Sequence, residues 1–397
     1  MIIAIPELMR ARYHPETLPH REPEIKKLDN IYRRNLLYPI GKCSHVTRVL
    51  GPVGSGKTCT VKTFTHRIKK DTEKHKVPLR IVYVNCKLGV KDRRSLYSRI
   101  LEAITGKTPP SYSPGEYLDR ITKYLAEEDL YLFLVLDDVD YLIRRDKRSE
   151  PEGGLVYDLT RLGEYYPRRA VNILGVVFIA QEQGFRDVLD QSERSSLGFL
   201  VIRLKGYDKE ELLDILRSRV YEAFNITAVP GEVLEYVCDL TTHGDYKGDC
   251  RYALGLLHTG GLIADESMSD QVQVDHIRKA VSETCWGPSM EELYSLDMQQ
   301  LLILLAIVQA LRVKARAYVM IRSVYDFYTM LSSTYDVEPL SYTRVKHLIK
   351  ELEHLVGIDY VPGKGVRLMD ASLDDFERVI ERALQQVTGT NSCNPPL

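Results

Sequence analysis

The most informative residues of the chain form a short loop with the composition of a phosphate-binding site. Residues 51–58 read Gly-Pro-Val-Gly-Ser-Gly-Lys-Thr, which matches the pattern G-x-x-x-x-G-K-[ST] at every fixed position. Glycines let consecutive backbone N–H groups turn inward around phosphate oxygens, and a helix that begins near Gly56 adds the positive end of its dipole. We expect the Lys57 ammonium to reach the β- and γ-phosphates and the Thr58 hydroxyl to ligate Mg²⁺. The nucleotide-binding residues predicted here are Pro52, Val53, Gly54, Ser55, Gly56, Lys57, Thr58 and Cys59.

Two acidic residues end an apolar run further along the chain. Residues 132–138 read Leu-Phe-Leu-Val-Leu-Asp-Asp. Downstream of a phosphate-binding loop, such a strand completes the magnesium site, so Asp137 is predicted to hold the ion and Asp138 to polarise the attacking water. The alternative interpretation of two aspartates at a strand end is a turn that caps the next helix.

Length and composition limit the classes of protein to which the chain can belong. A chain of 397 residues is long enough for two or three domains, each with its own core. The formal net charge of −1 gives no overall field for capturing nucleic acid, so such binding must come from local patches. The longest apolar run, 301–308, is too short to span a bilayer, and the seven cysteines form no C-x-x-C pair. We therefore expect a cytoplasmic protein without a membrane partner or a zinc site.

The elements that must position the loop and the acidic pair follow from the hydrophobic pattern. Strand-like runs separated by helix-like ones predict an α/β nucleotide-binding domain with a parallel sheet, as in P-loop NTPases. Near-continuous apolar character is typical of central strands that are covered on both faces. The predicted strands are 46–50, 80–85, 130–136, 172–179 and 199–204.

From Asp208 onward the pattern becomes helical, and it ends in a short hairpin. Pro-Gly-Lys-Gly between two strand-like runs within 357–368 predicts this hairpin, and three helices before it give the outline of a winged-helix domain. We expect a core at 1–206, an all-α lid at 207–290 and a winged helix at 291–390. The helices predicted after the one that starts at Asp208 are 230–242, 248–264, 273–284, 297–312, 317–333 and 341–355.

Several motifs in this order resemble an AAA+ ATPase of the archaeal replication-initiator family, which is related to the eukaryotic origin-recognition large subunit and its helicase-loading partner. Residues 13–22 resemble the family's N-terminal signature, which implies that Arg21 lies against the adenine. Tyr83-Val-Asn-Cys86 resembles its second strand. Residues 195–198 with Tyr207 resemble the passage into the lid, which implies that Tyr207 is a nucleotide-binding residue. Gly248-Asp-Cys-Arg251 resembles the sensor-2 motif, which implies that Arg251 senses the γ-phosphate.

Three positions depart from the family pattern, and each one favours slow ATP hydrolysis over fast turnover. Asp138 stands where the family usually has Glu, which withdraws the carboxylate by about one C–C bond, and an error of about 1 Å can cost on the order of a hundredfold in rate. Gln181 stands at the sensor-1 position, which is usually Asn. Ser192 stands where the trans-acting arginine finger is expected, with Arg194 two residues on.

Two segments are predicted to contact DNA. In a winged helix the third helix enters the major groove and the hairpin contacts the backbone or minor groove. The alternative for that helix is a solvated polar face. The basic run 144–148 precedes a segment, 152–161, at which the family inserts a helix that contacts DNA; the alternative is a solvated loop. The predicted DNA-binding residues are Arg144, Arg145, Lys147, Arg148, Ser341, Tyr342, Thr343, Arg344, Lys346, His347, Lys364 and Arg367.

Taken together, the motifs and the resemblance predict a chromosome-associated replication initiator that binds ATP or ADP with Mg²⁺. It would recognise double-stranded origin DNA, assemble with other initiator subunits or paralogues, and recruit the replicative helicase. Two alternatives stay open at this point. One is an accessory or negative regulator that binds origin DNA, and the other is a signalling NTPase whose winged helix ignores DNA.

Overall fold

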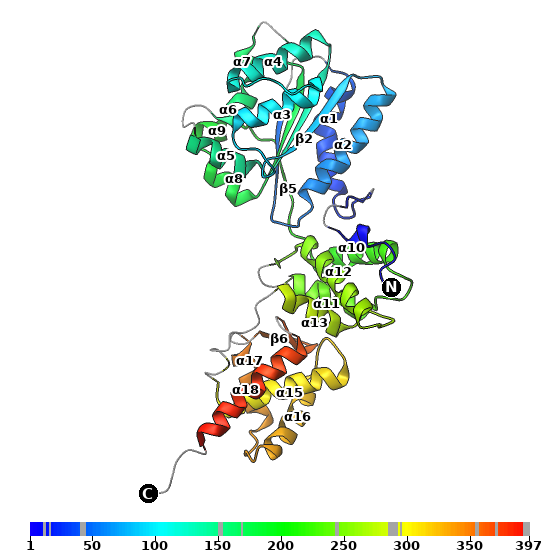
Figure 1. The fold of residues 1–397 in the computed structure, drawn as a ribbon, viewed down its shortest axis with the longest axis vertical. Coiled ribbons are helices and arrows are strands. Elements are labelled where there is room, and N and C mark those ends of the chain that lie inside the picture. Colours follow the sequence, from blue (N-terminus) through cyan, green and yellow to red (C-terminus); the bar gives the residue numbers. More distant parts are fainter. Residues whose placement is uncertain are drawn as a thin grey trace. The chain divides into compact units, whose positions relative to one another are not determined.

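The computed structural model describes residues 1–10, 13–15, 17–39, 45–149, 154–167, 170–242, 246–284, 293, 296–353, 357–369 and 372–391. Its contacts divide the chain into two compact units (Figure 1). The first is the α/β core, residues 14–211 with 248–250, and the second holds residues 1–13, 212–247 and 251–397. The predicted boundary between lid and winged helix, at residues 290 and 291, falls outside the described residues.

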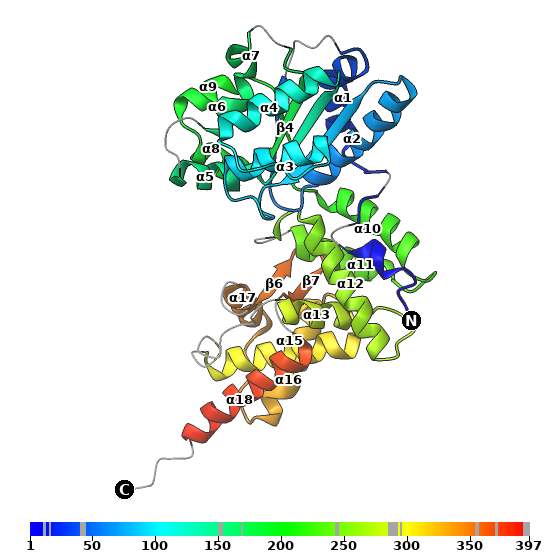
Figure 2. The same ribbon diagram turned by 45° about the horizontal axis from the view of Figure 1, so that its top comes forward.

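The core is a parallel sheet between two layers of helices (Figures 1 and 2). In the described part of the chain the strands lie in the order β2-β3-β4-β1-β5. Alternate residues of β3 face opposite layers: Leu132, Leu134 and Leu136 pack with α3 to α6, whereas Phe133 and Val135 pack with α1 and α2. The elements of this unit are α1 (Glu22–Leu37), β1 (His45–Leu50), α2 (Lys57–Lys74), β2 (Leu79–Asn85), α3 (Arg93–Thr105), α4 (Pro114–Glu127), β3 (Tyr131–Asp137), α5 (Val139–Ser149), α6 (Leu155–Thr160), α7 (Leu162–Tyr165), β4 (Ile173–Ala180), α8 (Glu182–Val188), α9 (Gln191–Ser196) and β5 (Val201–Arg203).

The second unit joins the lid helices and the winged helix. Helix α15 is the centre of the winged-helix core, with residues 301–308 buried, and a side-chain capping box between Asp297 and Gln300 starts it. In Figure 2 the hairpin β6–β7 lies beside α17. The elements are η1 (Pro6–Met9), α10 (Lys209–Ala223), α11 (Gly231–Thr242), α12 (Cys250–Glu266), α13 (Val274–Thr284), α15 (Met298–Lys314), α16 (Ile321–Thr334), α17 (Tyr342–Leu352), β6 (Ile358–Val361), β7 (Gly365–Leu368) and α18 (Leu373–Asn391). No described helix is long and apolar enough to cross a bilayer.

Two features of this unit differ from the sequence-based expectation. The first residues of the chain were assigned to the core, but Ile3 pairs with Phe224 and the Ala4 N–H donates to the Ala223 carbonyl, so the lid holds this segment. Helix α18 was not predicted. Its buried residues Phe376, Ile380 and Leu384 belong to the winged-helix core, which is thus larger than three helices and a hairpin.

Candidate functional site

The phosphate loop connects β1 to α2, and its glycines are required by its shape. Gly54 and Gly56 have φ angles of 69° and 85°, in the left-handed region that favours glycine. A Cβ on Gly54 would stand 1.8 Å from Oδ1 of Asp249, and one on Gly56 would stand 2.5 Å from the Tyr207 hydroxyl. A larger residue at either position would therefore force the loop to change its conformation or to lose its contacts with Asp249 and Tyr207.

The lysine of the loop lies along the loop itself. Its Nζ donates to the carbonyls of Gly51 and Pro52 at 2.9 and 2.6 Å, and the buried Ser55 donates its hydroxyl to the Pro52 carbonyl at 2.8 Å. Lys57 is also the first residue of α2, so its ammonium stands near the positive end of that helix. The Lys57 ammonium and the N-terminal end of α2 are therefore both suited to bind an anion in the loop.

The described side chains fit a magnesium site at the end of β3. Thr58 donates its hydroxyl to Oδ2 of Asp137 at 2.8 Å, and Asp137 is nearly buried. Oδ1 of Asp137 accepts the Asp138 N–H at 3.0 Å, which fixes the carboxylate. A hydroxyl and a carboxylate at this separation are the oxygen pair that P-loop proteins use for Mg²⁺.

The role of Tyr83 was not predicted: its hydroxyl also donates to Oδ2 of Asp137. Burial and the Asp137 carboxylate hold the pKa of Tyr83 well above its usual range, so the hydroxyl stays a donor. Its side chain comes from β2, which pairs with β3 in register. The only sequence signal was its place two residues before the end of a strand.

Asp138 and Gln181 lie at the same edge of the sheet. Asp138 has a φ of 53°, and its carboxylate accepts from Asn85 Nδ2 at 3.3 Å and pairs with Lys87 at 3.4 Å. Gln181 directly follows β4, which lies between β1 and β3, and its side chain is exposed. The sheet order thus puts Gln181 between the phosphate loop and the acidic pair, at the carboxyl ends of the strands.

Arg21 donates hydrogen bonds to the backbone of the phosphate loop and of a second segment. It is almost fully buried, its Nε donates to the Ser55 carbonyl at 3.0 Å, and its Nη2 donates to the Lys205 carbonyl at 2.8 Å. Its guanidinium also lies 3.7 Å from the centre of the Tyr207 ring. The place against adenine that the resemblance implied stays a prediction; in this structure the guanidinium joins the loop to the segment that precedes α10.

The sensor-2 segment packs on the same loop. The Cys250 N–H donates to the Gly54 carbonyl at 3.3 Å, and Asp249 lies against Gly54. Arg251 follows in the first turn of α12 and is exposed.

In the winged helix, α17 presents a polar face and a buried face. Val345, Leu348, Ile349 and Leu352 belong to the core, and the Ser341 hydroxyl accepts the Arg344 N–H at 3.4 Å and caps the helix. The exposed face carries the other predicted contact residues, which are Tyr342, Thr343, Arg344, Lys346 and His347. Glu351 lies 4.0 Å from Arg344 and 2.9 Å from His347, so the C-terminal end of this face is less favourable to phosphate.

Comparison with known proteins agrees with each part of this architecture. Family models match at residues 44–189 (AAA domain), 213–282 (Cdc6 AAA+ ATPase-type lid domain) and 291–380 (CDC6 C-terminal winged helix domain). ORC1-type DNA replication protein 2 of Saccharolobus solfataricus is 30% identical over 405 residues, an alignment that covers 98% of this chain and 94% of that protein. The chain belongs to the ORC1-type DNA replication proteins. A relative in Thermococcus kodakarensis is 30% identical over 356 residues, covering 88% of this chain and 82% of the relative.

Solved structures agree with the fold. Cdc6p from Pyrobaculum aerophilum superposes with a TM-score of 0.83 at 25% identity, covering 97% of this chain and 99% of that one. The Aeropyrum pernix ORC1 protein, solved in complex with DNA, gives a TM-score of 0.61 at 26% identity, covering 98% of each chain. The predicted fold class, an AAA+ core with a helical lid and a winged helix, is confirmed, and so is the predicted family.

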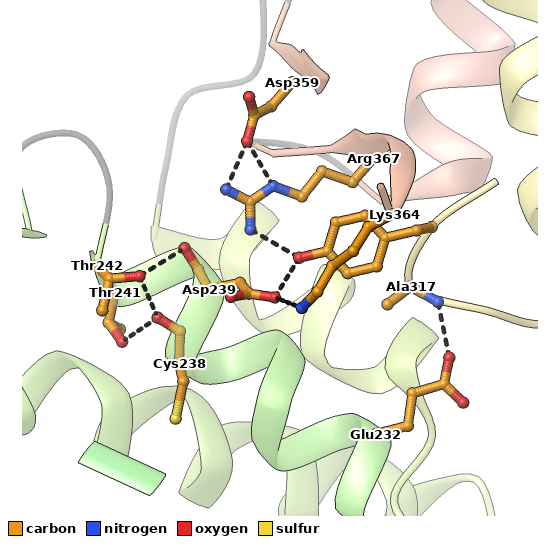
Figure 3. A network of polar contacts seen from close by, with 10 residues as sticks. Glu232, Cys238, Asp239, Thr241, Thr242, Ala317, Asp359, Lys364 and Arg367 are labelled. Carbon is orange, nitrogen blue, oxygen red and sulfur yellow. Dashed lines mark hydrogen bonds and ion pairs between the residues drawn. The ribbon is translucent and has the colours of Figure 1, made fainter. Parts of the chain in front are cut away.

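The structure corrects the expectation for the wing of this ORC1-type protein. Arg367 is completely buried, and its Nε and Nη2 atoms lie 2.8 and 2.6 Å from Oδ2 of Asp359. Lys364 lies 2.8 Å from Oδ2 of Asp239 on the lid helix α11 (Figure 3). A buried, paired guanidinium does not reach phosphate in this conformation, so Arg367 is not part of the interface that we propose.

The basic run forms the second half of α5, which begins directly after Asp138, so it is not the loop that was the alternative. Arg144 is exposed, whereas Lys147 pairs with the buried Glu193 and lies 3.5 Å from Asp190. Lys147 therefore holds α9 on the core instead of offering its charge to DNA, and the side chain of Arg148 lies outside the described residues.

The segment predicted as an inserted helix forms α6, whose apolar residues are buried. Arg93 of α3 joins this segment to α5. It lies 2.9 Å from Asp146 of α5 and 3.2 Å from Asp158 of α6, and Tyr97 donates to Asp158 at 2.8 Å. This buried ionic network ties the inserted segment to the helix that carries Arg144 and Arg145.

Proposed function

We propose that this ORC1-type protein binds ATP or ADP with Mg²⁺ in the core and recognises double-stranded origin DNA with its winged helix. One observation carries the nucleotide part: the hydrogen bond between Thr58 and Asp137, which joins the phosphate loop to the end of β3. When bound, Mg²⁺ supplies charge neutralisation for the phosphates. Thr58 and Asp137 hold the ion, Lys57 faces the β- and γ-phosphates, and Arg251 responds to the γ-phosphate.

Hydrolysis in this proposal is slow and acts as a switch. Asp138 is the group that orients the attacking water, but its carboxylate is one methylene shorter than Glu and already engages Asn85 and Lys87. Gln181 offers an amide to the same region. Ser192 of α9 cannot replace an arginine finger, and the neighbouring Arg194 donates to the Arg186 carbonyl at 2.9 Å.

The DNA part rests on α17 and on the DNA-bound structure of the A. pernix relative. Arg344 and Lys346 offer cations on the exposed face of α17, and Tyr342 and Thr343 offer hydroxyls near its N-terminal end, where recognition helices commonly contact bases. Arg144 and Arg145 on α5 form a second basic surface in the core. Two separate surfaces would compensate for a chain of near-neutral net charge.

We further propose that the protein assembles on origins with other initiator subunits or paralogues and recruits the replicative helicase. This part rests on the family alone. Its nucleotide state would set the assembly, since the lid contributes Arg251 next to the segment that packs on the phosphate loop.

The experiment that tests the proposal measures nucleotide and duplex binding in the full-length protein. Calorimetric titration with ADP and ATP, with and without Mg²⁺, tests the first part. Anisotropy titration with origin and scrambled duplexes tests the second. Nucleotide binding without preference for origin duplex would favour a signalling NTPase instead.

The departures at Asp138 and Ser192 favour a second candidate, an accessory or negative regulator that binds the same origins. It would occupy origin DNA without supporting assembly. Depletion of the protein in cells separates the two roles: origin firing falls if the protein initiates and rises if it represses.

A further inference from the structure

The lid and the wing are joined by a polar network that we call the lid–wing contact, formed by Asp239, Tyr318, Lys364, Arg367 and Asp359 (Figure 3). Asp239 is on α11 of the lid, and Oδ2 of this residue accepts hydrogen bonds from Lys364 Nζ at 2.8 Å and from the Tyr318 hydroxyl. Lys364 also lies 5.1 Å from the centre of the Tyr318 ring. The network bridges residues that are distant in sequence.

The chemistry of the lid–wing contact distinguishes the two cations of the hairpin. The Arg367 side chain is 0% exposed and Asp359 of the same hairpin holds it, so it cannot change partner without unfolding the wing. The Lys364 side chain is 36% exposed and pairs with a carboxylate that is 7% exposed. A partly exposed lysine is a compact charge on a flexible stem, and a DNA phosphate is the kind of anion that competes for it.

A second set of bonds joins the lid to the hairpin and to the segment that pairs with it through Val319 and Val366, without using a cation of the wing. The Tyr236 hydroxyl donates to the Leu368 carbonyl at 2.9 Å, and Glu232 accepts the N–H of Ala317, two residues before Val319, at 3.2 Å. These bonds keep the wing docked when Lys364 changes partner. The wing therefore has a fixed position and one exchangeable charge.

We propose that Asp239 is a positioning residue of the DNA interface, which holds Lys364 and thereby withholds the wing from the set of phosphate-binding groups. While Lys364 is paired with Asp239, α17 is the only part of the winged helix that contacts DNA. Removal of the Asp239 charge releases Lys364 to bind one more phosphate. This inference rests on the proposed DNA binding.

The test compares full-length variants on one duplex in a potassium chloride series, with affinity measured by fluorescence anisotropy. Asp239→Asn should tighten binding several-fold and steepen the log–log salt slope by about 0.9, the contribution of one neutralised phosphate. Lys364→Ala should leave the wild-type slope unchanged, and the double variant Asp239→Asn with Lys364→Ala should return to it. Glu232→Gln is the matched control for Asp239→Asn. It also removes one negative charge from α11, but Glu232 pairs with the Ala317 N–H and not with Lys364.

Two results would overturn the inference. A slope that flattens by about 0.9 in Lys364→Ala would mean that Lys364 already binds phosphate in the wild type. Weaker binding by a folded Asp239→Asn protein, with no steeper slope, would mean that Asp239 only stabilises the wing. If Asp239→Asn does not fold, the salt slope of Lys364→Ala tests the inference by itself: an unchanged slope supports it and a flatter slope overturns it. Absence of any duplex binding by the wild type would contradict the proposed function itself, whereas normal binding with equal slopes contradicts this inference alone.

Discussion

The nucleotide site and the wing are both built from charged side chains, but they use them in opposite ways. In the core, Lys57 and Thr58 begin the helix that follows β1, and Asp137 ends β3, so the parallel sheet brings these residues together at its carboxyl edge. In the wing, Lys364 and Arg367 are engaged by carboxylates on the lid and on the hairpin. A motif cation such as Lys57 can be assigned to phosphate binding from sequence, because the backbone fixes its position. A cation of the wing can be assigned to DNA binding only when the structure shows whether an acidic side chain already pairs with it.

The largest expected effect concerns the core. Lys57→Ala should weaken ATP and ADP binding by more than about 100-fold, because it removes a charge-assisted hydrogen bond to phosphate. ADP at a hundred times its Kd, which should stabilise the wild type by about 2.7 kcal/mol, should then leave the variant's Tm unchanged. Calorimetry and thermal unfolding measure both effects. Lys69→Ala, an exposed lysine of the same helix, is the control and should behave as wild type. Unchanged affinity in Lys57→Ala would contradict the assignment of the loop.

Asp138→Glu should raise the rate of hydrolysis by about tenfold to a hundredfold, since the longer side chain restores the usual reach at the same charge. The rate constant from a single-turnover experiment measures the chemical step, and nucleotide affinity should stay within about twofold of the wild type. Asp138→Asn should hydrolyse ATP more slowly than the wild type. A flat or lower rate in Asp138→Glu would show that another group, such as Gln181, limits the reaction.

On α17, Arg344→Ala should cost about 1–3 kcal/mol on origin duplex and relax sequence preference, if the guanidinium reads a base edge. Its matched control is Arg322→Ala on α16, which removes an exposed arginine that lies 3.8 Å from Asp326. Anisotropy titration with origin and scrambled duplexes measures both affinity and preference. Equal reductions in affinity on every duplex would mean that Arg344 binds phosphate.

The smallest effect concerns α5. Replacing Arg144 and Arg145 together by Ala should flatten the salt slope by about 0.9 for each phosphate that these arginines neutralise, while α17 is untouched. Lys147 is left in place because its removal would leave the buried Glu193 without this cation and confound the result. An unchanged slope would mean that the α5 surface is only solvated.

Sequence could predict most of the core because its signals are local. The loop, the acidic pair and the strands rest on consecutive residues, and the structure has the five predicted strands within about two residues of their expected ends in most cases. The helix α17 was also expected, since its apolar residues recur at helical spacing.

What sequence could not provide depends on tertiary contacts. Tyr83 of β2 donates to Asp137 of the neighbouring strand β3, Arg21 donates to the Ser55 carbonyl, and Lys147 pairs with Glu193 of α9. Nothing in the neighbourhood of these residues indicates their partners. The burial of Arg367 was missed for the same reason, because a hairpin considered alone would expose it. The functional roles assigned to individual site residues stay predictions.

The most direct test of the account is nuclease footprinting of the full-length protein, with ADP or ATP and Mg²⁺, on origin fragments from its own genome. The account predicts a protected stretch on origin fragments at salt that abolishes protection of unrelated DNA, and loss of that protection in Arg344→Ala. Protection that is equal on origin and unrelated fragments, or unchanged by Arg344→Ala, would contradict origin recognition through α17.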